Sequence, residues 1–277
     1  MTSRIGSNAV TWVEGTQHDR SRGPDQLARS WDQAAAGYDD YFLPRFAPWV
    51  CDAVETLPAE LPPGALVVPC CGTGPELLHL SARFPERAIV GIDLSAGMLA
   101  RATERTQHLP NVSLRIADAS DSSEWPAAAA VVSLFGLQQL PDPASGLRSW
   151  MAALVPGGVL SVIFWPQIIE EDGPFAWFRA ALMRHLPLPV PSWETELHAA
   201  LAQSGGHLQE DRTISHSMRH DSAADFLAAV LDSGPGRVLV ERQGSTWTDL
   251  LRREFLTHTP SGSIAHMPAA RHLVARR

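Results

Sequence analysis

Between residues 65 and 165, short apolar runs alternate with helical patterns, and this alternation limits the folds open to the chain. Five runs have the length of a strand: 65–69, 88–92, 112–116, 128–135 and 159–165. Helical patterns separate several of them, at 76–84, 96–107 and 144–154. Largely apolar strands joined by helices are typical of a parallel sheet that is covered on both faces. Because such crossovers are right-handed, we expect an α/β fold with a doubly wound sheet.

The flanking segments complete the expected organisation. Residues 1–24 are polar and without period, which predicts a flexible lead-in. Apolar spacing over 25–60 predicts N-terminal helices, and 61–277 holds the main domain. Beyond residue 165 we expect further helices, a polar strand and a closing strand, in this order: 175–186, 193–202, 208–218, 223–231, 246–256 and 270–275.

A glycine loop follows the first strand and opens the next helix. Its sequence is Cys71-Gly72-Thr73-Gly74. Glycine permits positive φ and close approach of a ligand to the backbone, and a helix start offers unpaired N–H groups. Asp93 ends the second strand, where a carboxylate can accept both hydroxyls of a ribose. Together these features predict a site for a nucleoside cofactor.

Two details favour an adenosine without a diphosphate. A dinucleotide fingerprint needs a third glycine, and that slot holds Leu77, which argues against a nicotinamide dehydrogenase. Asp118 follows the third strand, where its carboxylate can accept a hydrogen bond from an adenine amino group.

The segment from Trp31 to Trp165 resembles the class I S-adenosylmethionine-dependent methyltransferases, and in particular the branch of this family that acts on small molecules. The similar pieces occur in the family's order: Trp31-Asp32, Ala35, Tyr38-Asp39, Cys71-Gly72-Thr73-Gly74, Gly91-Ile92-Asp93-Leu94-Ser95, Met98, Ala102, Ala117-Asp118-Ala119, Leu140-Pro141-Asp142-Pro143 and Leu154-Val155-Pro156-Gly157-Gly158. The first of them correspond to a helix that closes over the cofactor in that family.

The resemblance implies a Rossmann-like sheet of seven strands, mostly parallel, with an antiparallel last strand at 270–275 beside the fifth. It also implies a helical cap over the substrate at about 166–206. The implied cofactor is S-adenosylmethionine, with these residues around it: Tyr38, Cys70, Cys71, Gly72, Thr73, Gly74, Asp93, Leu94, Met98, Asp118, Ala119, Phe135 and Gln138. Expected around the substrate are Tyr38, Gln139, Trp165, Phe175 and Phe178. The aromatic residues of this cap either pack it onto the sheet or line an apolar pocket.

The chain departs from the family at two places. Val68 stands where the family has an acid that organises the methionine amino end, and Cys70 stands at a glycine position. Gln138 stands where many relatives have a histidine, and an amide cannot take a proton. Catalysis is then expected to depend on placement, or on a base from the cap. The candidates for a catalytic role are Tyr38, Gln138 and His185.

Composition removes other mechanisms. All 22 basic residues are arginine, so the sequence lacks the lysine of Schiff-base enzymes, P-loop NTPases and ordinary protein kinases. The net charge of −8 argues against a nucleic-acid partner. Three cysteines without a CxxC pair, and no apolar stretch long enough for a bilayer, indicate a cytoplasmic protein with no metal site and no membrane partner. A homodimer is left open.

We therefore expect a transferase that moves the methyl group of S-adenosylmethionine to a small, apolar or aromatic acceptor of secondary metabolism. The altered segment 68–70 leaves an alternative open, in which the same cofactor undergoes internal displacement and releases methylthioadenosine without an acceptor. A binding module without activity is the third possibility.

Overall fold

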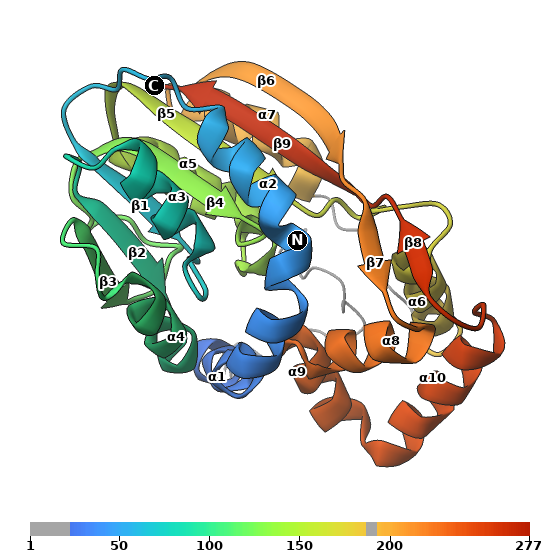
Figure 1. Ribbon diagram of the computed structural model, residues 1–277. Coiled ribbons are helices and arrows are strands. Elements are labelled where there is room, and N and C mark those ends of the chain that lie inside the picture. Colours follow the sequence, from blue (N-terminus) through green and yellow to red (C-terminus); the bar gives the residue numbers. More distant parts are fainter. Residues whose placement is uncertain (1–22, 187–192) are drawn as a thin grey trace, which may run out of the picture.

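The structure is a computed structural model that describes residues 23–186 and 193–277. Its centre is a seven-stranded sheet in the order β3-β2-β1-β4-β5-β9-β6 (Figure 1). The strands are β1 (Ala65–Pro69), β2 (Ile89–Asp93), β3 (Val112–Ile116), β4 (Ala128–Leu134), β5 (Leu154–Phe164), β6 (His207–Ser215) and β9 (Ala269–Arg276). Strands β1 to β5 pair in parallel, whereas β9 is antiparallel to both β5 and β6.

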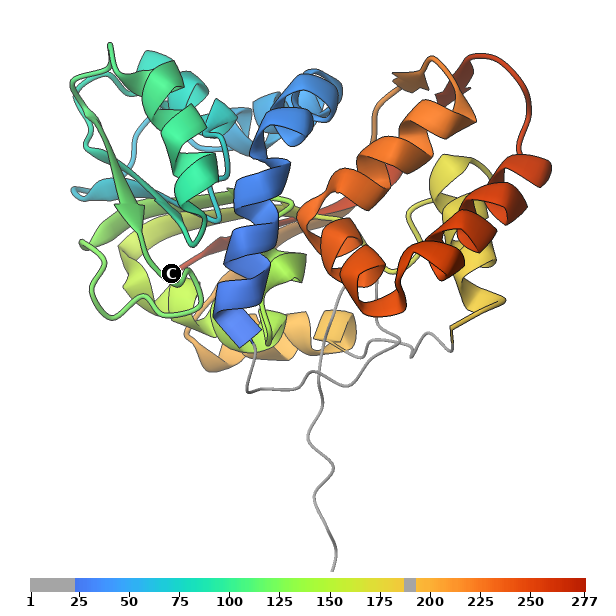
Figure 2. The ribbon, with the colours of Figure 1, turned by 90° about the horizontal axis from the view of Figure 1, so that it is seen from below.

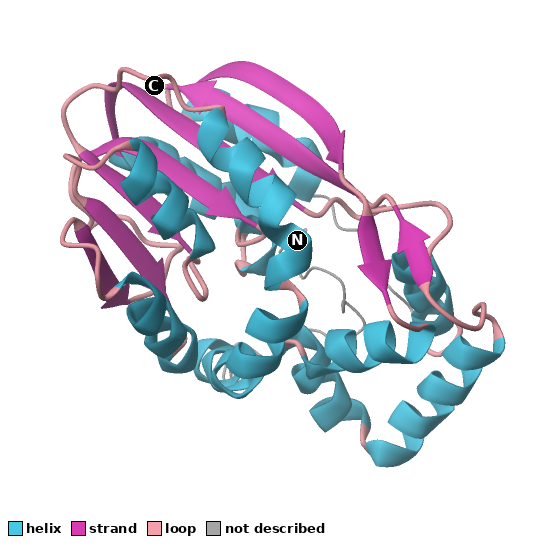
Figure 3. Ribbon diagram, in the orientation of Figure 1, coloured by secondary structure: helices cyan, strands magenta, loops and turns pink. Residues whose placement is uncertain are grey.

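This topology confirms the expected doubly wound sheet with an antiparallel last strand. The closing strand β9 lies between β5 and β6, and Ser161 of β5 pairs with Val274. A second, two-stranded sheet of β7 (Met218–His220) and β8 (Ile264–His266) stands apart from it (Figure 3). The expected polar strand at 208–218 therefore divides into β6 and β7.

The helices connect the strands, cover the sheet and form a separate lobe. They are α1 (Gly23–Tyr41), α2 (Leu43–Glu55), α3 (Pro75–Arg83), α4 (Ala96–Thr106), the short 3₁₀ helix η1 (Leu137–Gln139), α5 (Pro143–Ala153), α6 (Pro174–Met183), α7 (Trp193–Gln203), α8 (Ala223–Asp232), α9 (Gly234–Gln243) and α10 (Ser245–Thr257). Helix α9 was not expected. It begins at Gly-Pro-Gly, where the hydroxyl of Ser233 accepts a hydrogen bond from the Gly236 N–H.

The main sheet is buried because its strands alternate side chains between two apolar layers. Leu66 and Val68 of β1 belong to the core shared with α2 and α3. Ala65 and Val67 point into the opposite core, with α5 and α7. Both faces are thus covered by helices, which accounts for the nearly continuous apolar character of the central strands.

The two helices of the segment 166–206, which the sequence predicts as a cap, have different neighbours. Helix α7 packs on α5 and β6 at the sheet, while α6 packs against α8 and α10. We define the cap as α6, β7, α8, α9, α10 and β8, which stand beside α1 in Figure 2. Periodicity reveals that a helix has an apolar face but not which surface covers it. The expected lead-in 1–24 lies outside the described residues up to residue 22, and α1 begins at Gly23.

A buried histidine joins three elements of the main domain. Nε2 of His272 on β9 lies 3.0 Å from the hydroxyl of Ser161 on β5, and that hydroxyl donates to the Ala53 carbonyl of α2. Because the hydroxyl hydrogen goes to Ala53, Ser161 accepts from the Nε2–H of a neutral His272. Burial, with a smaller effect of Arg212, lowers the pKa of His272 to about 4.

Acid should therefore destabilise the protein in a defined range. The pKa of His272 is lower in the folded than in the unfolded chain, so its stabilising effect is complete above about pH 6.5 and is lost as the pH falls toward 4. For the ligand-free protein we expect the free energy of unfolding to decrease over this range, by up to about 3 kcal/mol from this group. Urea denaturation of His272→Gln should show a shallower pH dependence, whereas the exposed His108→Gln should match the parent. Equal slopes in all three proteins would contradict this assignment.

Candidate active site

The glycine loop lies at the carboxyl end of β1 and leads directly into α3. Gly74 adopts φ 77° at the start of the helix, which a residue with a side chain adopts only with strain. Gly72 has φ 51°, and a Cβ placed on it would meet no atom within 4 Å. The backbone of Gly72 therefore borders open space, as expected for a loop that a ligand approaches closely.

Asp93 lies at the end of β2, beside this loop. Its carboxylate accepts hydrogen bonds from the N–H of Gly72 at 2.8 Å and from the N–H of Ser95 at 2.9 Å. Burial raises the pKa of Asp93, and the hydrogen bonds from Ser95 and Gly72 oppose that rise. The structure thus brings together the two features that the sequence placed nineteen positions apart, with Leu94 half-buried and Met98 buried next along the chain.

The third acidic position is more open. Asp118 follows β3, is exposed, and accepts a hydrogen bond from the Ser120 N–H at 2.8 Å. Ala119 is buried, and its carbonyl accepts from Nε1 of Trp150 at 2.7 Å. The adjoining Ala117 N–H donates to the Asp93 carbonyl, which ties this turn to the end of β2.

Helix α1 is fastened to the start of α4 by Asp32. One oxygen of its carboxylate accepts from the Ser95 hydroxyl at 2.6 Å and from the Gly97 N–H at 2.8 Å. A Cβ on Gly97 would lie 2.8 Å from the Asp32 backbone, so the helices touch where Gly97 has no side chain. A carboxylate at a helix N-terminus is favourable because it meets the positive end of the helix dipole.

Arg105 makes a second link between α1 and the glycine loop. From α4 it donates to both carboxylate oxygens of Asp39 on α1, at 2.8 and 2.9 Å. It also donates to the Thr73 carbonyl within the loop. Such forked charge-assisted bonds fix geometry as well as supply energy. Through Arg105 the position of α1 is coupled to the shape of the loop.

Tyr38 lies on the same helix, near the acids of the site. Burial, with Glu76, Asp93 and Asp39 adding to it, raises the pKa of the Tyr38 phenol well above its ordinary value. The phenol therefore stays neutral at physiological pH and is a hydrogen-bond donor, not a base. Its ring contacts Trp31 edge-on at 5.6 Å and Phe42 at 5.5 Å.

Strained backbone occurs where the family pattern changes. Cys70 and Phe135 are the non-glycine residues with positive φ in the described chain, at 53° and 54°. They follow β1 and β4, and Gly136 lies against Cys70, since a Cβ on Gly136 would be 2.5 Å from the cysteine Cβ. Such outliers persist where the surroundings hold them and cluster at ligand sites. Burial raises the pKa of the Cys70 and Cys71 thiols well above its usual range, and both are free.

The expected substrate residues Trp165 and Phe175 join an aromatic cluster with Phe135 and Phe46. The rings of Phe135 and Trp165 are stacked, with centroids 4.2 Å apart and an angle of 7°. Phe46 of α2 approaches Phe135 at 4.7 Å, and Phe175 of the cap approaches Trp165 at 5.6 Å. This aromatic wall (Phe46, Phe135, Trp165, Phe175) lies at the carboxyl ends of β4 and β5. Phe178 is 1% exposed and packs within the cap.

The remaining candidates are spread out. Gln138 is buried and Gln139 half-buried in η1, just after Phe135. His185 bonds instead to Glu254 of α10, in the cap. The three candidates for catalysis lie on different elements: Tyr38 on α1, Gln138 on η1 and His185 in the region after α6.

Two histidines that no motif marked form a buried chain of hydrogen bonds. The Tyr41 hydroxyl lies 2.7 Å from Nδ1 of His220, whose Nε2 lies 2.9 Å from Nε2 of His266. Nδ1 of His266 lies 2.7 Å from Glu170. Burial lowers the pKa of His220 to about 3, so this imidazole remains neutral. The chain links α1, both strands of the small sheet and the loop before α6.

The glycine loop and the start of α3 carry two buried polar atoms, one on Thr73, which the sequence predicted at the site, and one on Glu76, which it did not. Among the described residues, Oγ1 of Thr73 and Oε2 of Glu76 have no hydrogen-bond partner. Both side chains are at most 3% exposed, and both lie at the glycine loop. Unpaired buried polar groups are costly and call for a ligand or another explanation. The residues present at this loop therefore fit a polar cofactor group. The sequence signal was a glutamate two positions after the last loop glycine.

Within residues 23–186 and 193–277, no helix is long and apolar enough to cross a membrane. The same residues contain no group of three metal-ligating side chains placed to share an ion.

Comparison with known proteins gives a consistent result. The sequence pattern of a family described as "Methyltransferase domain" matches residues 68–158. Trans-aconitate 2-methyltransferase of Azoarcus sp. is 34% identical over 202 residues, covering 68% of this chain and 76% of that protein. The namesake enzyme of Methylobacterium nodulans is 38% identical, but the match spans 51% of this chain and 52% of that protein. Malonyl-[acyl-carrier protein] O-methyltransferase of Hahella chejuensis is 29% identical over 98% of this chain and 94% of its own length.

Solved structures agree on the fold. Phosphoethanolamine N-methyltransferase 2 of Haemonchus contortus, in complex with phosphomonomethylethanolamine and S-adenosylhomocysteine, has a TM-score of 0.54 at 16% identity. The match covers 91% of this chain and 59% of that one. A geranyl diphosphate methyltransferase in complex with sinefungin has a TM-score of 0.51 at 15% identity, over 83% and 77% of the two chains.

The doubly wound sheet, its glycine loop and the acid after β2 define an α/β enzyme with a nucleoside cofactor. With the relatives above, the assignment is specific: the chain belongs to the class I S-adenosylmethionine-dependent methyltransferases, and S-adenosylmethionine is the cofactor of this family. The expected family, enzyme class and cofactor are confirmed.

The link from Arg105 to Asp39 should control cofactor affinity. In Asp39→Asn the guanidinium loses its charged partner, so α1 is held less firmly over the loop. Because a hydrogen bond to a charged group contributes about 1.5–3 kcal/mol, we expect S-adenosylhomocysteine to bind about tenfold more weakly by calorimetry. Asp40→Asn, at the next and exposed position of α1, is the matched control. If both variants bind like the parent protein, the link does not act on the site.

Proposed function

We propose that the protein transfers the methyl group of S-adenosylmethionine to a small-molecule acceptor with an apolar or aromatic body. The observation that carries this proposal is the aromatic wall at the carboxyl ends of β4 and β5. In open α/β sheets, ligands bind in the crevice outside the carboxyl ends of the strands. Aromatic side chains there favour an acceptor that can stack or bury apolar surface.

The residues around the glycine loop take the binding roles in this proposal. Gly72, Thr73 and Gly74 hold the amino-acid end, with Cys70 and Cys71 beside them. Asp93 binds the ribose, and Asp118 with Ala119 binds the adenine. Leu94, Met98, Phe135, Gln138 and Tyr38 complete the surroundings. The cofactor supplies an activated methyl group, whose carbon–sulfur bond breaks as the bond to the acceptor forms.

Placement, more than proton transfer, is the expected source of the rate. The Tyr38 phenol has a raised pKa, Gln138 is an amide, and His185 is engaged with Glu254. The neutral His220 has a lowered pKa and is a poor proton acceptor. Alignment of two reactants in a site closed to water can account for a large rate enhancement without a base. We therefore propose that α1 and the cap orient the acceptor and exclude water.

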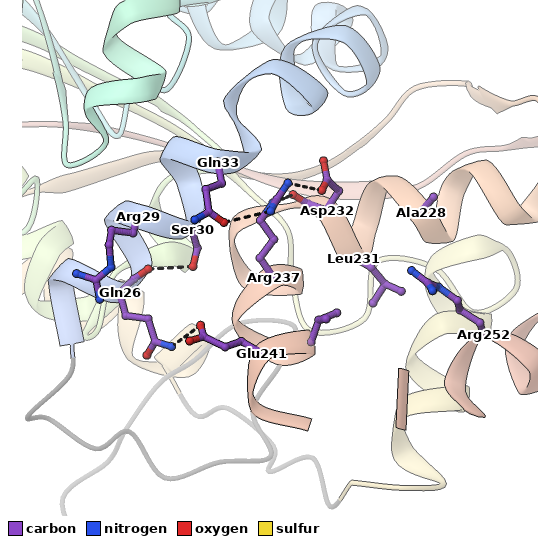
Figure 4. Close-up of a pocket in the computed structure, with 11 residues that line it drawn as sticks. Gln26, Arg29, Ser30, Gln33, Ala228, Leu231, Asp232, Arg237, Glu241 and Arg252 are labelled. Atoms are coloured by element: carbon purple, nitrogen blue, oxygen red, sulfur yellow. Dashed lines mark hydrogen bonds and ion pairs between the residues drawn. The ribbon is translucent and has the colours of Figure 1, made fainter. Parts of the chain in front are cut away.

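A polar cavity lies between part of α1 and the cap, although α1 also packs on α8 and α9. It has a volume of about 440 Å³ and is lined by residues of α1, α8, α9 and α10 (Figure 4). Arg237 donates to Asp232 and to Gln33, and Gln26 donates to Glu241. A cavity lined by polar side chains that bond to one another does not suit an apolar acceptor. A polar boundary can open more easily than an apolar core, so we propose that the acceptor enters where α1 and the cap separate.

The names of the relatives keep a second acceptor class open. Two of them act on trans-aconitate and malonyl-[acyl-carrier protein], whereas a Thermosynechococcus vestitus relative, 35% identical over 119 residues, is a 2-phytyl-1,4-naphthoquinone methyltransferase. That match covers 42% of this chain and 52% of that protein. The aromatic wall favours the quinone-like or phenolic class over the carboxylates.

Product analysis tests the reaction type. The protein is incubated with S-adenosylmethionine alone and with naphthoquinones, phenols or small carboxylic acids, and products are followed by mass spectrometry. We expect S-adenosylhomocysteine in proportion to a methylated aromatic acceptor. Methylthioadenosine formed in stoichiometric amount without an acceptor would replace this proposal with internal displacement. Methylated carboxylates alone would move the acceptor to the other class.

The aromatic wall can be tested separately from cofactor binding. Trp165→Leu removes the ring that stacks on Phe135 but keeps an apolar side chain. We expect kcat/KM for an aromatic acceptor to fall about tenfold, as for an aromatic contact plus the lost burial. The affinity for S-adenosylhomocysteine should stay within twofold. Trp193→Leu, on the opposite face of the sheet, is the control, because its ring packs on Phe164 in the other core. An unchanged kcat/KM in Trp165→Leu would exclude the wall from acceptor binding.

The proposal also includes the cellular location and the oligomeric state that the sequence predicts. The free cysteines suit a reducing, cytoplasmic location. A homodimer stays a prediction that light scattering can check.

A further inference from the structure

Glu76 is an unusual residue at the start of α3. It is 3% exposed, and its Oε2 has no hydrogen-bond partner among the described residues. A buried carboxylate is strongly disfavoured unless it is paired or loses its charge. Leu77 and Leu80 already provide the apolar contacts of α3 with the sheet, so packing of the helix does not require an acid at position 76.

The groups that face Glu76 leave it without a counter-charge of its own. Arg105 of α4 is the nearby cation, and it is occupied by Asp39 and the Thr73 carbonyl. The charges of Glu76 and Asp93 both help to raise the pKa of the Tyr38 phenol on α1 and of the Cys71 thiol in the loop. Helix α2 contributes apolar side chains to the core shared with α3. Glu76 and Asp93 therefore border the same loop, and a cationic group is the missing partner.

The strand before the loop supplies no charge. Val68 of β1 is fully buried in the apolar core. No other unpaired buried carboxylate was found in the part of the chain that the structure describes.

We propose that Glu76 binds the α-amino group of the cofactor through the buried carboxylate oxygen that has no partner in the protein. This inference rests on the proposed function, because it needs a cofactor with an amino-acid end. It explains why a carboxylate is kept in an apolar setting beside the loop. It also makes Glu76 a determinant of selectivity between adenosyl ligands with and without an ammonium group.

The protonation of Glu76 gives the proposal a specific signature. Burial raises the pKa of Glu76 to about 7, and a hydrogen bond from its own backbone N–H, with a smaller effect of the Arg105 charge, lowers it only in part. Near pH 7 about half of the ligand-free molecules carry a proton on this carboxyl. An ammonium group favours the ionised form, so its binding should release a proton.

The experiment is calorimetry with two ligands that differ in the amino-acid end. S-adenosylhomocysteine carries the ammonium group, whereas methylthioadenosine lacks it. For Glu76→Gln we expect affinity for S-adenosylhomocysteine to fall at least about tenfold, as for loss of a charge-assisted bond, and affinity for methylthioadenosine to stay within twofold. At pH 7, buffers of different ionisation enthalpy should reveal proton release from the parent protein with S-adenosylhomocysteine alone. The exposed Glu86→Gln is the control and should behave like the parent.

Thermal unfolding verifies that the variant is folded and checks the setting of Glu76. The pKa of Glu76 is higher in the folded than in the unfolded chain, so the folded protein loses stability as the pH rises from about 4.5 toward 7. Ligand-free Glu76→Gln should therefore melt above the parent at pH 8, with the difference disappearing near pH 5.

The outcomes separate this inference from the proposed function. If Glu76→Gln weakens both ligands equally, or neither, Glu76 does not bind the amino group and the inference fails while the family assignment stands. If the parent protein binds neither ligand, the proposed function itself fails.

Discussion

The packing of α1 against two different bodies is the constraint on which the site depends. On one side, the carboxylates of Asp32 and Asp39 fasten it to α4 and, through Arg105, to the glycine loop. On the other, Trp31 lies against Gly234 of α9, where a Cβ would come within 2.4 Å of its ring. The cap and the glycine loop are therefore both linked to α1. In the proposed reaction, this coupling would let acceptor binding and cofactor closure occur together.

The side chain of Cys70 in the glycine loop is accommodated by the residues that follow β4. Cys70 occupies a family glycine position and keeps the positive φ that a glycine would adopt. Its side chain needs room, and Gly136 provides it after β4. Phe135, immediately before, is turned into the left-handed region and stacks on Trp165. The aromatic wall and the altered loop thus form one structural unit, and the change at position 70 affects the acceptor side as well as the cofactor side.

The electrostatics of the site depend on how few cations lie near the glycine loop. The chain has arginine as its only strong cation, and Arg105 is committed to α1. At the loop, Oε2 of Glu76 is left without a hydrogen-bond partner, and the charges of Glu76 and Asp93 both act on the Tyr38 phenol. Such an arrangement is unfavourable in the empty protein and becomes favourable when a ligand brings positive charge. Binding and closure should therefore stabilise the protein together.

The sequence by itself determined the alternation of strands and helices between residues 65 and 165, and the position of the loop and Asp93. These features depend on local patterns: apolar runs, glycines where φ is positive, and an acid at a strand end. It did not determine the cap, because amphipathic helices such as α6 and α7 look alike until their partners are known. Nor did it predict the roles of Arg105, Glu76 or the His220–His266 pair. Those roles arise from contacts between residues far apart in the chain, such as Tyr41 with His220 and Asp39 with Arg105. Only the tertiary structure decides which charges are paired and which are left for a ligand.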